Sequence, residues 1–215
     1  MAAGRLRISA VWVLVFFLIS VMLVFATLRI SIDSANLAEG VVPGEDSFDR
    51  RYTLMPVLAY AHILPGVIYL CGAPFQLSRR FRNRHLALHR KMGRVLLTAG
   101  LISGVFALLF GALHAFGGFL EASAAVVFAL YFLLALSTAF RAVRAGDIVR
   151  HRRWMIRAFA IGLAVGTIRI WIGLFQAFEL LSFQDAFGPA FWISFLLHAT
   201  AAEVWLRWRP APREY

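Results

Sequence analysis

The chain consists of long apolar runs separated by short segments in which charged residues gather. A helix that crosses a bilayer needs about 20 consecutive, mostly apolar residues. Six stretches meet this requirement, and four of them contain no Asp, Glu, Lys or Arg. They are residues 8–28, 52–78, 95–120, 122–140, 158–178 and 186–206. The pattern predicts an all-α membrane bundle of six transmembrane helices that fills residues 1–215 as a single domain.

The composition supports this class of protein. Hydrophobic residues make up 61% of the chain and charged residues 15%, whereas soluble domains have about 45–50% and 25%. The chain contains one cysteine, Cys71, which excludes an intramolecular disulfide and a cysteine-based metal cage. The first apolar run is longer than the 7–15 residues of a signal-peptide core, so we expect a retained helix.

The basic residues predict the orientation in the membrane. The net charge is +11, and 18 of the 22 Lys and Arg residues fall in both tails and in the segments 79–94 and 141–157. By the positive-inside rule, both termini are expected to be cytoplasmic. The polar, acidic segment 29–51 is then an extracytoplasmic loop. The positive charge is explained by topology and by contact with anionic lipid headgroups, so no nucleic-acid partner is expected.

An internal repeat is suggested by the cytoplasmic entrances to the third and fifth predicted helices. His89 and His151 are 62 residues apart, as are Gly100 and Gly162, and also Gly104 and Gly166. Both copies enter the membrane from the same side, which is typical of parallel repeats of helical hairpins. The paired glycines favour close helix packing in lipid.

Three motifs resemble those of an uncharacterised bacterial family, catalogued as domain of unknown function number 2306. They are Gly72-Ala73-Pro74-Phe75-Gln76, His89-Arg90-Lys91-Met92-Gly93-Arg94, and His151-Arg152-Arg153-Trp154-Met155-Ile156-Arg157 followed by Arg169. The resemblance covers roughly the second to sixth predicted helices. It implies a multi-span inner-membrane protein and brings no activity with it, and it supplies no histidine at the position of His198.

Ionisable residues inside the predicted helices are candidates for a binding site, because such groups are costly in hydrocarbon and usually face the bundle interior. His62, Arg169 and His198 come to similar depths on three helices at about 1.5 Å per residue. Tyr69 shares a helix face with His62, and Ser194 shares one with His198. We therefore predict a ligand- or cofactor-binding site from these five residues.

The chemistry of that site stays open at the level of sequence. Arg169 keeps its charge and has no Asp or Glu at its depth, so an anionic ligand or a haem propionate would supply its counter-ion. His62 and His198 are the minimum for a bis-histidine haem b. A quinone or small carboxylate fits the same donors, and hydrogen bonds that only hold the bundle together are the simplest alternative. No metal site is assigned.

Two further sets of residues have expected roles nearer the cytoplasmic face. The first set lies at two helix entrances and is expected to bind anionic lipid or phosphate. The alternative is that these residues serve only as ordinary membrane anchors. They are His89, Arg90, Lys91, His151, Arg152 and Arg153. Glu203 is expected to form a structural ion pair with Arg157 or Arg94.

No catalytic motif is visible in the sequence, so an enzymatic role is not favoured. The leading hypothesis is a membrane protein that binds a small ligand or cofactor in the bundle core. The alternatives are a small permease or proton-coupled transporter, and an accessory or assembly subunit of a membrane complex. Either a homodimer or a larger complex is compatible with six spans.

Overall fold

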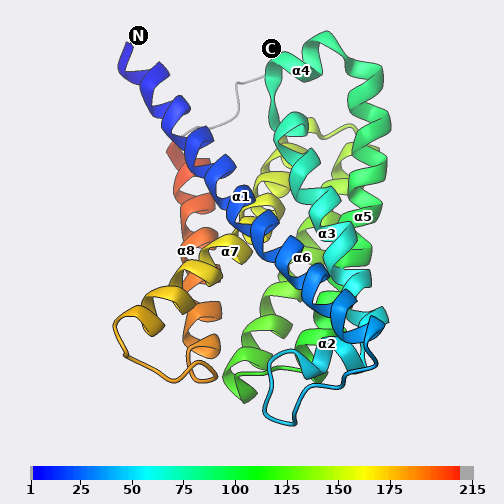
Figure 1. Ribbon diagram of the computed structural model, residues 1–215. Coiled ribbons are helices and arrows are strands. Elements are labelled where there is room, and N and C mark those ends of the chain that lie inside the picture. The colour runs from blue at the N-terminus through cyan, green and yellow to red at the C-terminus, as the bar shows by residue number, and fades with distance from the viewer. Residues whose placement is uncertain (1, 209–215) are drawn as a thin grey trace.

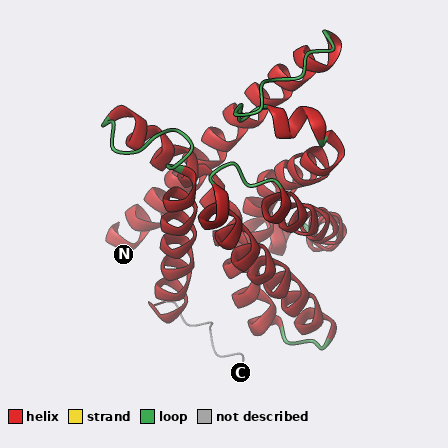
Figure 2. Ribbon diagram, turned by 90° about the horizontal axis from the view of Figure 1, so that it is seen from below, coloured by secondary structure: helices red, strands yellow, loops and turns green. Residues whose placement is uncertain are grey.

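The computed structural model describes the backbone of residues 2–208 and the side chains of residues 10–208. Within these residues all regular structure is helical, joined by short loops (Figures 1 and 2). Arg209 and Arg213 of the predicted basic tail lie outside the described residues. The helices are α1 (Ala2–Ala38), α2 (Arg50–Leu54), α3 (Pro56–Leu77), α4 (Arg79–Arg84), α5 (Leu86–Leu113), α6 (Gly118–Arg144), α7 (Ile148–Ala177) and α8 (Phe187–Trp208).

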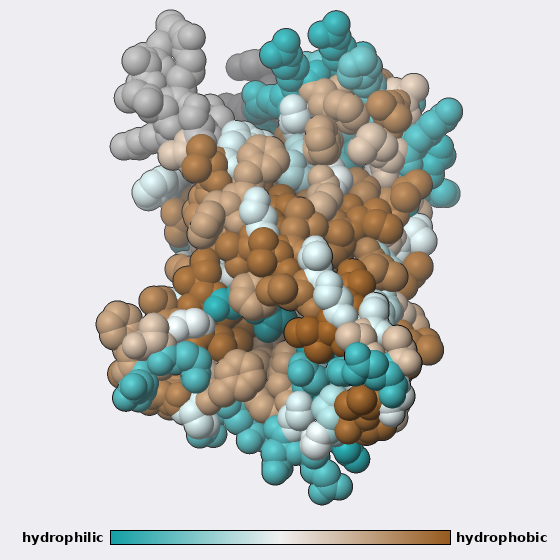
Figure 3. Space-filling model, in the orientation of Figure 1, coloured by the Kyte–Doolittle hydropathy of each residue, from teal (hydrophilic) through white to brown (hydrophobic). Residues whose placement is uncertain are grey.

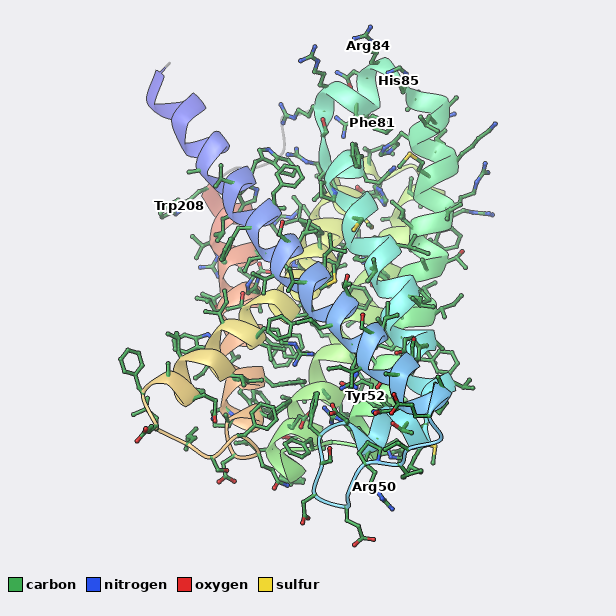
Figure 4. All side chains as sticks on the ribbon, viewed as in Figure 1. Arg50, Tyr52, Phe81, Arg84, His85 and Trp208 are labelled. Carbon is green, nitrogen blue, oxygen red and sulfur yellow. The ribbon has the colours of Figure 1, made fainter. Side chains whose placement is uncertain are left out.

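The long helices run back and forth between two ends of the bundle (Figure 1). Helix α4, the turn between α6 and α7, the beginning of α1 and the end of α8 lie at one end. Helix α2, the α5–α6 turn and the α7–α8 connection lie at the other. Figure 4 places Arg84 and His85 at the first end and Arg50 at the second. An apolar belt separates these ends (Figure 3), as expected for a bundle that crosses a membrane.

Five helices are long and apolar enough to cross a membrane, namely residues 10–38 of α1 and all of α3, α5, α6 and α7. Helix α8 has 22 residues, which is sufficient length, but Pro189, His198 and Glu203 lower its hydropathy. The regular structure of residues 2–208 is therefore all-helical, and several of its helices are long and apolar enough to span a membrane. The sixth span stays a prediction.

Helix α1 continues ten residues beyond the predicted end of the first span. The expected loop 29–51 is helical from Arg29 to Ala38, and only residues 39–49 connect α1 to α2. The guanidinium of Arg29 binds the carboxylate of Asp33 one turn further along the helix, with Nε 2.9 Å from Oδ2. This pair satisfies both charges, so the helix does not end where the apolar run ends.

Helices α5 and α7 begin well before their predicted apolar segments. Helix α5 begins at Leu86 instead of residue 95, and α7 begins at Ile148 instead of residue 158. The Asp147 side chain caps α7 by accepting a hydrogen bond of 2.8 Å from the backbone N–H of Arg150. Hydropathy marks the part of a helix that lies in lipid, whereas capping decides where the helix starts.

Glycines allow three helices to approach closely in the core. A Cβ on Gly100 of α5 would lie 3.0 Å from the Tyr69 ring, and one on Gly162 of α7 would lie 3.6 Å from it. Tyr69 of α3 is thus held between two glycines. A Cβ on Gly166 would lie 2.6 Å from the carbonyl oxygen of Leu18, so α1 crosses α7 at backbone contact. Such close approach provides the dispersion energy that holds helices together in lipid.

The starts of four helices share the offset of the predicted repeat. Helices α3 and α6 begin at residues 56 and 118, and α5 and α7 begin at residues 86 and 148, so both pairs differ by 62. His89 and His151 are each the fourth residue of their helix, and both helices begin at the end where α4 lies (Figure 1). The repeat itself stays a prediction, which superposition of the two hairpins by one rotation would establish.

Candidate ligand-binding cavity

A cavity of about 600 Å³ lies between α1, α3, α5, α6, α7 and α8. Its volume falls within the range of roughly 300–1,000 Å³ typical of small-molecule sites. Most of its wall is aliphatic or aromatic. The aromatic part includes Phe25, Phe128, Phe132, Phe191 and Phe195. A few polar side chains interrupt this wall, and they come from helices that are distant in sequence.

The cavity has an opening between the second half of α1 and the last turns of α7. Several residues of these two helices both line the cavity and are exposed at the surface. They are Phe25, Leu28 and Ile32 on α1, and Gly173 and Gln176 on α7. Figure 3 shows a recess on this side of the molecule with hydrophilic residues at its back. The opening therefore faces sideways out of the helix bundle.

His62 of α3 lines the cavity and is oriented by Ser103 of α5. Its Nδ1 lies 3.0 Å from the Ser103 carbonyl oxygen, and the Ser103 hydroxyl donates to the His62 carbonyl at 2.9 Å. A carbonyl only accepts, so Nδ1 carries the hydrogen. Nε2 forms no hydrogen bond with any described residue.

Tyr69 lines the same cavity two helical turns further along α3. Its side chain is 2% exposed, and its hydroxyl has no hydrogen-bond partner among the described residues. Phe132 packs edge-on against the ring, with the centroids 5.4 Å apart. A buried hydroxyl without a partner is costly, which makes it a candidate donor to a ligand.

Arg169 of α7 lines the cavity and forms no ion pair with any described carboxylate. Its guanidinium lies 5.6 Å from the centre of the Phe25 ring. It also interacts with the side chain of Tyr52. The guanidinium of Arg169 is therefore stabilised by the Phe25 ring and the Tyr52 side chain, and no carboxylate of the described residues forms an ion pair with it.

A polar cluster at one end of the cavity was not predicted as part of the site. Arg29 binds Asp33 and Asp49, and the Tyr60 hydroxyl donates to Asp33 at 2.7 Å. The sequence predicted these charges to lie in the extracytoplasmic loop 29–51, yet Arg29 and Asp33 are buried. Their spacing of four residues was the available signal, because oppositely charged side chains at i and i+4 meet on a helix.

Arg51 and Glu121 form a second buried pair beside that cluster. Arg51 Nη1 donates to the carbonyl oxygen of His114 at 2.8 Å and lies 3.4 Å from Glu121 Oε1. Glu121 also accepts a hydrogen bond from the backbone N–H of Gly117. Five aromatic rings surround the Arg51 guanidinium at 4.5–5.9 Å. They are Phe48, Tyr52, Phe110, Phe116 and Phe187.

The structure does not bring His198 and Ser194 to the cavity. His198 Nε2 lies 2.7 Å from the Thr167 hydroxyl, between α8 and α7. Ser194 is fully buried and its hydroxyl has no partner among the described residues. Only His62 of the two predicted histidines lines the cavity, so the bis-histidine haem interpretation is not supported. No group of three or more His, Cys, Asp or Glu suited to a metal occurs in the described part of the chain.

Glu203 of α8 lies against Arg157 of α7, and not against Arg94. Arg157 Nε donates to Oε1 at 2.6 Å and Nη2 donates to Oε2 at 3.0 Å. The Trp154 ring lies 4.7 Å from the same guanidinium. This bidentate pair joins α7 to α8 outside the cavity.

The basic residues of the helix entrances lie together at the opposite end of the bundle from Arg51. His151 Nδ1 donates to the Ala139 carbonyl at 2.9 Å, whereas the buried His89 Nδ1 has no partner among the described residues. Arg90, Lys91 and the first turns of α5 are largely exposed. Arg152 and Arg153 follow His151 directly in the sequence of α7.

These features define a multi-pass helical membrane protein with a mostly apolar cavity between its helices and a polar cluster at one end of that cavity. The chain belongs to the family described as Predicted membrane protein (DUF2306), whose profile matches residues 59–206. No curated protein and no solved structure matches it. The match leaves out α1 and α2, so Phe25, Arg29 and Arg51 belong to a part of the cavity wall outside the matched region.

Proposed function

We propose that this protein crosses the bacterial inner membrane six times and binds a small lipophilic ligand in the cavity between its helices. The observation that carries the proposal is the buried Tyr69 hydroxyl, which has no hydrogen-bond partner among the described residues and lies in a mostly apolar cavity. The same cavity is lined by His62 and by Arg169, whose guanidinium has no ion pair within the described residues. Mostly apolar walls with a few placed polar groups are the usual composition of a ligand site.

The position of the opening favours a ligand that arrives through the bilayer. Exposed apolar residues of α1 form one side of the opening. In a membrane, this outer face of the bundle would contact lipid. A molecule dissolved in the bilayer would reach the cavity without crossing water. The polar groups inside would then orient it by hydrogen bonding.

The basic end is proposed to face the cytoplasm and to contact anionic lipid headgroups. Exposed Arg84 lies at this end (Figure 4), where α5 with its exposed Arg90 begins, whereas exposed Glu45 and Asp46 belong to the connection that leads to α2 at the other end (Figure 1). Each Lys or Arg near an anionic surface contributes about 1 kcal/mol of attraction. Such attraction would hold the bundle in the orientation that the positive-inside rule predicts.

A cavity-filling variant tests the proposed ligand binding. Ala129 of α6 lines the cavity, and the neighbouring Leu130 is exposed on the outside of the same helix. We expect a small molecule to copurify in one-to-one ratio with the wild type and with Leu130→Phe, and to be lost from Ala129→Phe. Native mass spectrometry measures the ratio. The same copurifying molecules on all three proteins would identify them as surface lipid and contradict the proposal.

A further inference from the structure

We infer that the ligand of this cavity is a lipophilic monoanion whose acidic group lies beside Arg169 and whose apolar body lies along the aromatic wall. This inference rests on the proposed function and adds the charge of the ligand to it. It follows from the way the charged groups of the cavity are paired.

Two of the three arginines that line the cavity already have carboxylate partners. Arg29 binds Asp33 and Asp49, and Arg51 binds Glu121. Arg169 alone among these three has no ion pair within the described residues. An arginine does not lose its charge in proteins, so a bound anion is the partner that Arg169 lacks.

The surrounding charges direct an anion to Arg169 and not to the other arginines. The charged groups that act on Arg169 include Arg51 and Glu121, which bind each other and largely cancel at a distance. The Arg29 cluster holds two carboxylates for one guanidinium, so it repels an anion. Arg169 is thus the arginine of the cavity wall that has no carboxylate in contact with it, and one negative charge on the ligand would fill that place.

Helix directions place His62 at the level of Arg169. Helices α3 and α7 run in opposite directions (Figure 1), and Tyr69 of α3 lies against Gly162 of α7. His62 and Arg169 are each seven residues, about 10 Å, from that contact toward the same end. His62 therefore lies at the same depth as the acidic group, but its Nε2 is a hydrogen-bond acceptor and adds no attraction for the anion, which is left to Arg169. Tyr69 marks the wall along which the apolar body extends.

A neutral ligand such as a quinone is the main alternative at this site. Its carbonyl oxygens would accept hydrogen bonds from Arg169 or Tyr69, but it would leave the guanidinium charge uncompensated in an apolar cavity. Unpaired buried charge is much more costly than an unpaired dipole. Charge is therefore the property that separates the two ligand classes in an experiment.

The test compares three probes of equal chain length. Radiolabelled dodecanoate, dodecan-1-ol and dodecylammonium are added at pH 8 to the full chain in nanodiscs, with protein-free nanodiscs as the blank. We expect saturable binding of dodecanoate at least tenfold tighter than that of the alcohol, and weakest binding of the cation. Arg169→Gln is expected to remove the preference for dodecanoate over the alcohol, whereas Arg169→Lys keeps it.

Arg141→Gln serves as the matched control, because Arg141 is exposed at the end of α6 and does not line the cavity. It should bind all three probes as the wild type does. Thermal midpoints of each variant show that it is folded. Equal binding of acid and alcohol, or equal loss in Arg141→Gln and Arg169→Gln, overturns the anion inference and leaves ligand binding standing. Failure of all three probes, together with no copurifying ligand, overturns both.

Discussion

Glu121 of α6 lies against Arg51 of α2 at one end of the cavity, with side-chain exposures of 3% and 12%. Removing one partner of a buried ion pair leaves the other charge unpaired, which costs about 3–5 kcal/mol. We expect Glu121→Gln to lower the free energy of unfolding by this order and to lower the thermal midpoint in detergent. Glu45→Gln is the control, since Glu45 is 91% exposed and 4.0 Å from Arg50. A midpoint unchanged in Glu121→Gln would show that the aromatic rings and the His114 carbonyl hold Arg51 without the ion pair.

The crossing of α1 and α7 depends on Gly166. A methyl group there would lie 2.6 Å from the backbone oxygen of Leu18, which cannot move as a flexible side chain can. Gly166→Ala is expected to lower the thermal midpoint by several degrees. Gly173→Ala, on the same helix, meets nothing within 4 Å and removes a poor helix former, so its midpoint should stay equal or rise. Equal midpoints for the two variants would contradict the close crossing.

Ser103 and Gly66 are expected to be energetically coupled. A Cβ on Gly66 would lie 2.8 Å from the Ser103 hydroxyl oxygen, which donates to the His62 carbonyl. Gly66→Ala alone should therefore destabilise the protein by displacing that hydroxyl. In the Ser103→Ala background the obstacle is gone, so the same change should cost little. A double-mutant cycle of unfolding free energies measures the coupling, and strict additivity would contradict the contact.

Sequence alone predicted the helical membrane class and the family, because both depend on hydropathy and on short motifs in α3, α5 and α7. It also identified His62, Tyr69 and Arg169, which the structure places on one cavity. It did not separate His198 from them, because equal depth on two helices says nothing about which neighbour each side chain faces. His198 faces Thr167 instead.

The charges near α2 were misjudged for a different reason. Arg29, Asp33 and Glu121 follow or precede apolar runs, and a hydropathy pattern assigns such residues to water. In the structure Arg29 and Asp33 of α1 bind each other, Glu121 of α6 lies against Arg51 of α2, and Arg29, Asp33 and Glu121 are buried. Pairing between distant segments satisfies a buried charge, and only the tertiary arrangement reveals which charges are paired.

The orientation of the bundle can be tested by cysteine labelling in a Cys71→Ser background. Glu45 and Asn83 are exposed at opposite ends of the bundle. If the basic end is cytoplasmic, a membrane-impermeant maleimide should label Glu45→Cys in intact spheroplasts. It should label Asn83→Cys only after lysis. The reverse pattern would place the basic residues outside and overturn the predicted topology.

The sixth span is tested by the same reagent on either side of α8. Glu179 lies in the connection before this helix, Arg207 lies in its last turn, and both are exposed. Helix α8 has 22 residues, about 33 Å at 1.5 Å per residue, which matches the roughly 30 Å hydrocarbon core. The Arg157–Glu203 pair and contact with α7 compensate for its lower hydropathy, so we expect it to cross. Glu179→Cys should then be labelled in intact spheroplasts and Arg207→Cys only after lysis. Labelling of both in intact spheroplasts would mean that α8 lies along the outer surface and that the chain crosses five times.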